Sequence, residues 1–174
     1  MPTARLFFAL WPDAAVRDEL LRAARMLHSS CGGRAMRGDD LHLTLVFLGD
    51  VLREKIPQLA AIAAAQRMPA FALEFGAVRY WQHNRILWAA PHAVPPPLFD
   101  FVVALESALE EAEFDFDRRP YVPHVTLLRG SRPAARPPPF ACTWPVRDFA
   151  LVEAVRDPSG VSYRTLERWD ARNQ

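Results

Sequence analysis

One short pattern, His-x-Thr-Leu, occurs twice in this chain and constrains its fold more than any other feature. The first copy begins at His42 and the second at His124, each within an apolar run. Side chains alternate between the two faces of an extended strand, so His and Thr share one face and the apolar residues share the other. One such strand is usually an ordinary strand with a half-buried histidine. Two copies in one chain favour a functional site.

The segments around the two copies follow a similar order, which indicates a duplicated lobe. Strands are predicted at 5–10, 41–48, 71–80, 85–90, 146–155 and 161–169, with a further strand at the second motif. Helices are predicted between 13 and 31, at 53–66 and at 98–109, and 131–139 reads as an exposed proline-rich loop. A pseudo-two-fold axis between two such lobes would bring both His/Thr faces together across a cleft.

The composition fits a folded globular chain and excludes several classes of protein. The 174 residues are 51% hydrophobic and 24% charged, enough for one domain or two small fused lobes. No apolar run approaches the roughly 20 residues of a membrane-spanning helix. The apolar run at 6–11 is short and suits a first strand better than a signal peptide, so a cytoplasmic location is expected. The two cysteines, Cys31 and Cys142, have neither a disulfide framework nor zinc-ligand spacing. A net charge of +1 argues against a long track along nucleic acid.

Two imidazoles and two threonine hydroxyls suit a particular kind of chemistry. One imidazole can accept a proton from water while the other gives a proton to a leaving oxygen. Threonine hydroxyls can donate hydrogen bonds to phosphate oxygens. The chain has no serine-nucleophile motif, no glycine-rich phosphate loop and no His-Glu-x-x-His metal set. These residues therefore point to metal-free, in-line cleavage of a phosphodiester, especially a strained cyclic one.

At these residues the chain resembles the two-histidine phosphoesterases, and in particular their bacterial RNA 2′,3′-cyclic phosphodiesterase branch, also called 2′-5′ RNA ligase-like proteins. The likeness covers 5–12, 41–49, 123–129 and 163–169, and extends over essentially the whole chain. It implies an α+β fold with two pseudo-symmetric lobes, whose antiparallel sheets line a central cleft and whose helices lie outside. Residues 1–174 would then form a single two-lobed domain, each lobe supplying one His-x-Thr motif.

The resemblance also implies an activity. Members of this family hydrolyse RNA-terminal or nucleoside 2′,3′-cyclic phosphates to 2′-phosphates without a metal or cofactor, and some also join RNA ends reversibly through a 2′-5′ linkage. The expected partners are RNA ends with a 2′,3′-cyclic phosphate, or nucleotides, with no membrane association. The protein itself is expected to be a cytoplasmic monomer.

Carried over residue by residue, the resemblance assigns His42 as the proton donor and His124 as the proton acceptor. Thr44 and Thr126 would hold the phosphate oxygens, together with Arg129. Pseudo-symmetry makes the two histidine roles look interchangeable. Arg129 lies five residues after His124, so strict alternation puts it on the opposite face, and it reaches the cleft only if the strand ends or bulges first.

Other interpretations remain open. The same cleft would suit another small cyclic phosphate, such as ADP-ribose cyclic phosphate. The fold could also serve a nucleotide-binding module without turnover, although intact motifs in both copies argue against that. Trp88 and Trp81 fit core packing better than base stacking. The family often has an aromatic residue before the first motif, whereas this chain reads Ala35-Met36-Arg37-Gly38 there.

Overall fold

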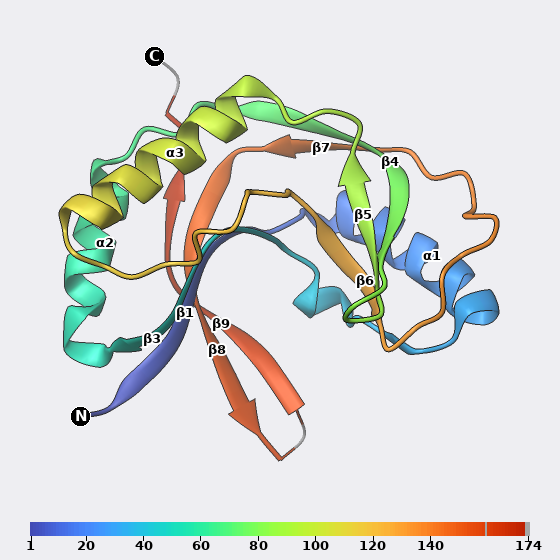
Figure 1. Cartoon of the computed structure of the whole chain (residues 1–174). Helices are drawn as coiled ribbons and strands as arrows, with labels where there is room; N and C mark the ends of the chain where they lie inside the picture. Colours follow the sequence, from blue (N-terminus) through green and yellow to red (C-terminus); the bar gives the residue numbers. More distant parts are fainter. Residues whose placement is uncertain (159, 173–174) are drawn as a thin grey trace.

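The computed structural model describes residues 1–158 and 160–172, within which nine strands form one curled antiparallel sheet (Figure 1). The strand order is β7-β4-β5-β6-β3-β1-β8-β9, and the short β2 pairs with β6 beside this path. The strands are β1 (Thr3–Leu10), β2 (Arg34–Ala35), β3 (Leu43–Leu52), β4 (Phe71–Trp81), β5 (Ile86–Pro91), β6 (Val125–Arg129), β7 (Cys142–Val146), β8 (Asp148–Asp157) and β9 (Gly160–Asp170). The helices are α1 (Ala14–Cys31), α2 (Ile56–Ala65) and α3 (Pro96–Glu111), with short 3₁₀ turns η1 (Gly38–Asp40) and η2 (Arg53–Lys55).

The sheet consists of two matching halves that meet at the two motif strands. Strands β6, β5, β4 and β7 make one half, and β3, β1, β8 and β9 repeat the same arrangement in the other. A single register pair, Leu43 opposite Val125, joins β3 to β6, and both residues are fully buried. The two predicted sheets are thus halves of one sheet that splays apart below this junction (Figure 1).

The helices cover the outside of the sheet, but not in the order of the chain. Helix α1 follows β1, yet it packs against β6 and β7 of the other half, whereas α2 and α3 pack on the half with β3 and β9 (Figure 1). The Asp13 carboxylate accepts from the Val16 amide at 2.9 Å and so caps α1. Four apolar residues recur at helical spacing in the sequence of α1, which predicts one apolar stripe, and all four are buried (Val16, Leu20, Ala24 and Leu27). The two halves are consequently interlocked by the chain path.

One hydrophobic core runs behind both halves of the sheet. Its largest fully buried side chains include Trp144, Phe8, Phe75 and Phe149. Burying an aromatic or leucine side chain contributes about 1.5–3 kcal/mol, so this layer supplies most of the driving force for folding. The two cysteines are both free and buried, and none of the helices in the described residues combines the length and apolarity needed to cross a membrane.

Strand β3 differs from its predicted bounds because a glycine bends it without ending it. The strand starts at Leu43 and continues through Gly49 to Leu52. Gly49 has φ of +71°, and the pairing with β1 shifts register beside it. A glycine in this left-handed conformation allows a bulge inside a strand. The predicted end of this strand at residue 48 was therefore wrong.

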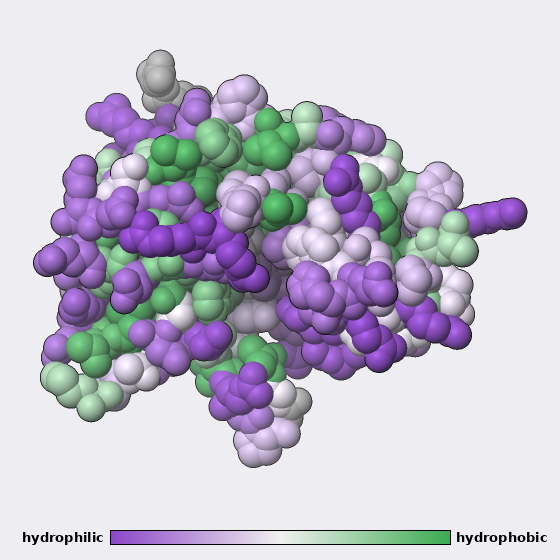
Figure 2. All heavy atoms as spheres, viewed as in Figure 1, coloured by the Kyte–Doolittle hydropathy of each residue, from purple (hydrophilic) through white to green (hydrophobic). Residues whose placement is uncertain are grey.

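Strand β7 was not predicted, and Val146 belongs to it rather than to the tail hairpin. The predicted proline-rich loop covers 131–139, and residues 140–145 were assigned to no element. A proline is tolerated in β7 because β7 is an edge strand, paired only with β4. The alternate burial of Cys142, Trp144 and Val146 is the signal that identifies it. The hairpin β8–β9 begins two residues later and projects from the body (Figures 1 and 2).

Candidate active site

His42 lies immediately before β3, in an aromatic enclosure. Its Nδ1 is 2.7 Å from the backbone oxygen of Asp40. Because a carbonyl oxygen only accepts, Nδ1 carries the hydrogen and donates it, which leaves Nε2 free. The imidazole is surrounded by the rings of Phe7, Trp11 and Tyr163, with centroids 4.8–5.1 Å away. The hydrogen bond fixes the tautomer of this histidine, and the aromatic rings fix its position.

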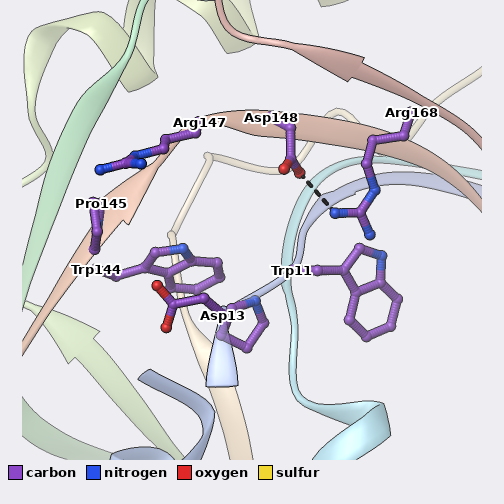
Figure 3. A pocket seen from close by; sticks show the side chains of 8 residues that line it. Trp11, Asp13, Trp144, Pro145, Arg147, Asp148 and Arg168 are labelled. Carbon is purple, nitrogen blue, oxygen red and sulfur yellow. Dashed lines mark hydrogen bonds and ion pairs between the residues drawn. The ribbon is translucent and has the colours of Figure 1, made fainter. Parts of the chain in front are cut away.

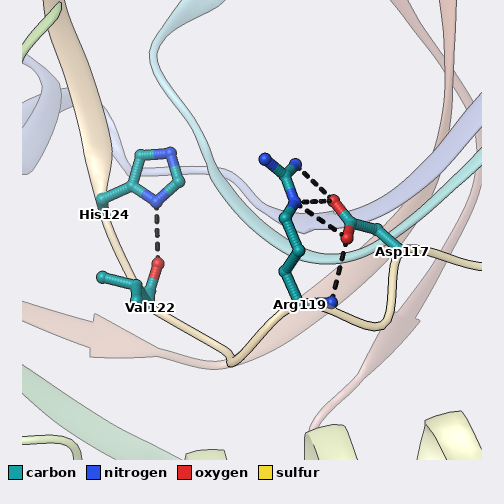
Figure 4. A network of polar contacts seen from close by, with 4 residues as sticks. All are labelled: Asp117, Arg119, Val122 and His124. Carbon is teal, nitrogen blue, oxygen red and sulfur yellow. Dashed lines mark hydrogen bonds and ion pairs between the residues drawn. The ribbon is translucent and has the colours of Figure 1, made fainter. Parts of the chain in front are cut away.

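His124 repeats this arrangement immediately before β6. Its Nδ1 is 2.7 Å from the backbone oxygen of Val122 (Figure 4). Two tryptophans pack edge-on against the ring, Trp81 at 4.6 Å and Trp88 at 5.8 Å between centroids. Both histidines thus donate from Nδ1 to the carbonyl two residues earlier, and both present a free Nε2. Each lies one residue ahead of the strand in which it was predicted, but shares a face with its threonine as expected.

Burial controls the protonation of both rings. It lowers the pKa of His42 to about 4 and also lowers the pKa of His124. The backbone hydrogen bonds act in the opposite direction but do not compensate. A charge on His124 lowers the pKa of His42 further, which places the two imidazoles within electrostatic range of each other. At neutral pH His42 is neutral in the free protein, so its Nε2 can accept a hydrogen bond or a proton.

A bulge brings Arg129 to the same face as His124 and Thr126. Leu127 and Leu128 are both fully buried in succession, which breaks the alternation of β6. The pairing with β5 shifts register at this point and leaves Leu127 without an opposite residue. Arg129 therefore faces the cleft, and its charge lowers the pKa of both histidines. This is the bulge that sequence alternation required for Arg129 to reach the site.

Strand β3 contains the same bulge. Leu45 and Val46 are buried in succession, and the pairing with β1 shifts register beside them. Phe47 consequently takes the position that Arg129 has in the other half, on the face of Thr44. The Arg5 guanidinium lies 4.9 Å from the centroid of the Phe47 ring. The two halves therefore match in backbone shape and differ in chemistry at this position.

A cavity of about 410 Å³ lies between the two motif strands and contains four of the five predicted residues in its lining. These are Thr44, His124, Thr126 and Arg129. His42 does not line this cavity, since its ring is enclosed by aromatic side chains. The surface is hollowed between the two halves, above the projecting hairpin (Figure 2).

The loop before the second motif forms part of the cavity wall, which the sequence did not reveal. The Asp117 amide donates to the Phe47 carbonyl at 2.9 Å, and its carboxylate pairs with Arg119, which faces the His124 ring (Figure 4). The Tyr121 hydroxyl donates to the Thr44 carbonyl at 3.3 Å, and burial raises the pKa of this tyrosine. These contacts bind the loop to β3. No periodicity or motif in the sequence marks them.

The tryptophans near the histidines pack and line the site at the same time. Trp88 is only 4% exposed, as expected for a packing residue, but its Nε1 is buried without a hydrogen-bond partner in the described structure. Trp81 lines the cavity. The Nε1 of Trp11 is likewise buried without a partner within the described residues. Each histidine thus contacts a tryptophan whose buried indole N–H has no partner in the described structure.

A second cavity, of about 290 Å³, is lined in part by Trp11 (Figure 3). Its lining includes Trp144, Arg147 and the ion pair of Arg168 with Asp148 at 3.2 Å. It contains none of the five predicted site residues. Over the residues that the structure describes, no three His, Cys, Asp or Glu side chains converge in a way that could hold a metal ion.

Comparison with known proteins connects this geometry to a family. The family described as LigT like Phosphoesterase matches residues 10–88. The chain is 32% identical over 167 residues to a protein from Escherichia coli named RNA 2′,3′-cyclic phosphodiesterase, covering 95% of each. A protein of the same name from Thermus thermophilus is 30% identical over 183 residues, covering 98% of this chain and 91% of that protein.

Solved structures agree with this similarity. The crystal structure of Escherichia coli LigT in apo form has a TM-score of 0.90 at 30% identity, covering 99% of this chain and 100% of that chain. The same protein complexed with 3′-AMP gives a TM-score of 0.89 with the same coverage. The curled antiparallel sheet and its two motif strands are therefore shared with solved phosphoesterases of this type.

Proposed function

This chain belongs to the LigT-like phosphoesterase family, and on that basis we propose that it opens 2′,3′-cyclic phosphates at RNA ends, or on nucleosides, to give 2′-phosphates. The observation that carries the proposal is the pair of matched imidazoles. His42 and His124 each donate from Nδ1 to a backbone carbonyl and leave Nε2 free for proton transfer. Two such groups can serve an acid step and a base step in one reaction, each contributing about 10² to 10⁴ in rate.

We also propose a role for each histidine. We assign His124 as the base that takes a proton from water, whose oxygen attacks the phosphorus. His42 then gives a proton to the 3′-oxygen as its bond to phosphorus breaks, which leaves a 2′-phosphate and a 3′-hydroxyl. The Asp40 carboxylate raises the pKa of His42, whereas none of the influences on His124 comes from a carboxylate. An anionic substrate would raise the pKa of His42 further and let it take up the proton that it donates.

The remaining predicted residues suit the phosphate itself. The Thr44 and Thr126 hydroxyls lie on the cleft face of their strands and can donate to the non-bridging oxygens. Arg129 adds a positive charge where negative charge develops in the transition state. Because the bulges bring Thr126 and Arg129 to one face, the phosphate can bind both at once. We propose that these three residues hold the phosphate between the two imidazoles.

The test is a short RNA that ends in a 2′,3′-cyclic phosphate, incubated with the protein in excess EDTA. We expect a product with a 2′-phosphate and a free 3′-hydroxyl. A 3′-phosphate product would refute the assigned leaving oxygen. No conversion with or without added divalent metal would refute the activity, and conversion only with metal would refute the metal-free mechanism. The His42→Ala protein provides the background rate.

We further propose that the 174 residues act as one two-lobed domain and as a monomer in the cytoplasm. The chain path and the shared core support a single domain. Helix α1 follows a strand of one half and packs on the other, and α3 does the same in the opposite direction, so neither half has a complete helix layer without the other. Light scattering coupled to size exclusion measures the molecular mass. A mass near 39 kDa, about twice the 19.7 kDa of the chain, would refute the monomer.

A further inference from the structure

The short strand β2 is only two residues long, yet backbone contacts on both sides of it fix its position against β6. The Met36 amide donates to the Leu127 carbonyl, and the Arg132 amide donates to the Cys31 carbonyl, both at 2.9 Å. A Cβ atom on Gly33 would lie 2.7 Å from the Arg129 carbonyl oxygen, so only glycine permits this approach. These contacts hold β2 against the end of β6, where β3 has already diverged from it.

This position places two arginines directly opposite each other. Arg34 is the register partner of Arg129, and directly opposed residues in an antiparallel pair share one face. The neighbouring pair, Ala35 and Leu128, faces the core, so both arginines face the cleft. Directly opposed like charges destabilise a sheet. A pair held this rigidly therefore fits a site that binds an anion.

Neither guanidinium is neutralised by the protein. Across the described residues, no carboxylate forms an ion pair or hydrogen bond with Arg34 or Arg129, whereas other arginines such as Arg37 and Arg53 are paired. The Tyr163 ring lies 4.8 Å from the His42 ring, and both arginines are near enough to influence its hydroxyl. This hydroxyl has no hydrogen-bond partner in the described structure. Two cations and a free O–H donor thus face the same space beside His42.

We propose that Arg34, with Arg129 and Tyr163, binds a second phosphate, the one attached to the 5′-carbon of the ribose that carries the cyclic phosphate. The inference rests on the proposed function and extends it to the substrate class. Arg129 faces both the cyclic phosphate and this subsite, and Arg34 lies one strand further out. The enzyme then distinguishes an RNA end from a free nucleoside cyclic phosphate by this additional charge. A 5′-phosphodiester and a 5′-pyrophosphate share the required chemistry.

The test compares substrates with and without this phosphate on one variant, Arg34→Ala. The substrates are adenosine 2′,3′-cyclic phosphate, its 5′-phosphorylated form, and a diadenosine dinucleotide that ends in the cyclic phosphate. We expect kcat/KM to fall about tenfold for the last two, as for the loss of one charge-assisted contact, and to change less than about twofold for the first. ADP-ribose cyclic phosphate tests a 5′-pyrophosphate in the same assay. If Arg34→Ala lowered kcat/KM for this substrate but not for the dinucleotide, the assignment of the subsite to RNA would be overturned.

Two controls separate the subsite from a general effect of charge or folding. Arg25→Ala removes an equally exposed arginine from α1 and should leave all substrates unchanged. Arg34→Lys should recover part of the loss, and Arg34→Ala should make kcat/KM for the dinucleotide less dependent on salt concentration, because one charge contact is lost. An equal loss on every substrate, or no loss on any, would overturn the subsite while leaving the proposed function intact. Inactivity of the unmodified protein on all substrates would instead overturn the proposed function.

Discussion

The burial of His42 predicts that this protein loses stability in mild acid. In the unfolded chain its imidazole titrates near pH 6.5, whereas in the folded protein burial lowers the pKa to about 4. Between these values the unfolded state binds more protons, so stability falls as the pH falls through this window. A difference of two to three pKa units corresponds to about 3 kcal/mol, which is lost between about pH 6.5 and pH 4.

The assay is urea unfolding followed by tryptophan fluorescence at about pH 7, 5.5 and 4.5, on the unmodified protein and on His42→Asn. Asparagine does not titrate, so the variant should lose less stability on acidification, by about 2 kcal/mol at the lowest pH. Acid effects from His124 and from the carboxylates occur in both proteins and cancel in the difference. His92→Asn, which removes an exposed histidine, is the matched control and should behave like the unmodified protein.

One outcome would refute the reasoning directly. If the stability difference between the unmodified protein and His42→Asn were the same at all three pH values, the imidazole would not be held neutral by burial. The aromatic enclosure of Phe7, Trp11 and Tyr163 would then leave the ring accessible to water. A chemical-shift titration of the His42 ring would then measure its pKa in the folded protein. A value near 6.5 would show that burial does not lower the pKa of this ring, whereas a value near 4 would place the discrepancy in the unfolded state.

The other predictions concern the site more directly. His42→Ala and His124→Ala should each reduce kcat by at least about 10² while leaving the unfolding midpoint within a few degrees, and a near-normal rate in either would refute the acid–base pair. The pH profile of kcat/KM should be bell-shaped with its maximum below neutral pH, because burial lowers the pKa of both histidines, and a flat profile between about pH 5 and 9 under rate-limiting chemistry would contradict it. Tyr121→Phe removes the hydroxyl that donates to the Thr44 carbonyl and should cost about 1 kcal/mol in urea unfolding. Gly33→Ala should cost about 1–3 kcal/mol, since φ is +82° and the new Cβ would clash with the β6 backbone, and an unchanged midpoint would show that β2 can shift.

The sequence predicted those features that depend on local alternation and on composition. The shared face of His42 and Thr44, the apolar stripe of α1 and the β4–β5 hairpin all follow from the period of the side chains. The resemblance to a known family supplied the two-lobed α+β arrangement. Each of these could be inferred from a contiguous stretch of chain without knowledge of its partners.

The features that the sequence did not reveal depend on partners far away in the chain. The bulge at Leu127 becomes visible only in the register with β5, because two successive leucines look like an ordinary apolar run. Strand β7 contains Pro145, which is compatible with a strand at the edge of a sheet, and that edge position depends on the pairing of β7 with β4. The pairing of Arg34 with Arg129 required β2 to occupy the space that β3 leaves. Register and edge position are properties of the whole sheet, so no local pattern encodes them.

The departure from symmetry carries more functional information than the symmetry. Both halves repeat a His-x-Thr motif, a bulge and a histidine with a free Nε2, and these shared features alone would let a cyclic phosphate bind in either direction. Arg129 and Phe47 occupy matching positions after the two bulges, and only the arginine half also has Arg34 opposite. In the proposed subsite, a substrate with a negative chain would extend toward β6 and β2 rather than along β3. A fixed direction for the chain would fix which ribose oxygen faces which histidine, so the proposed subsite and the proposed acid and base roles can be tested together.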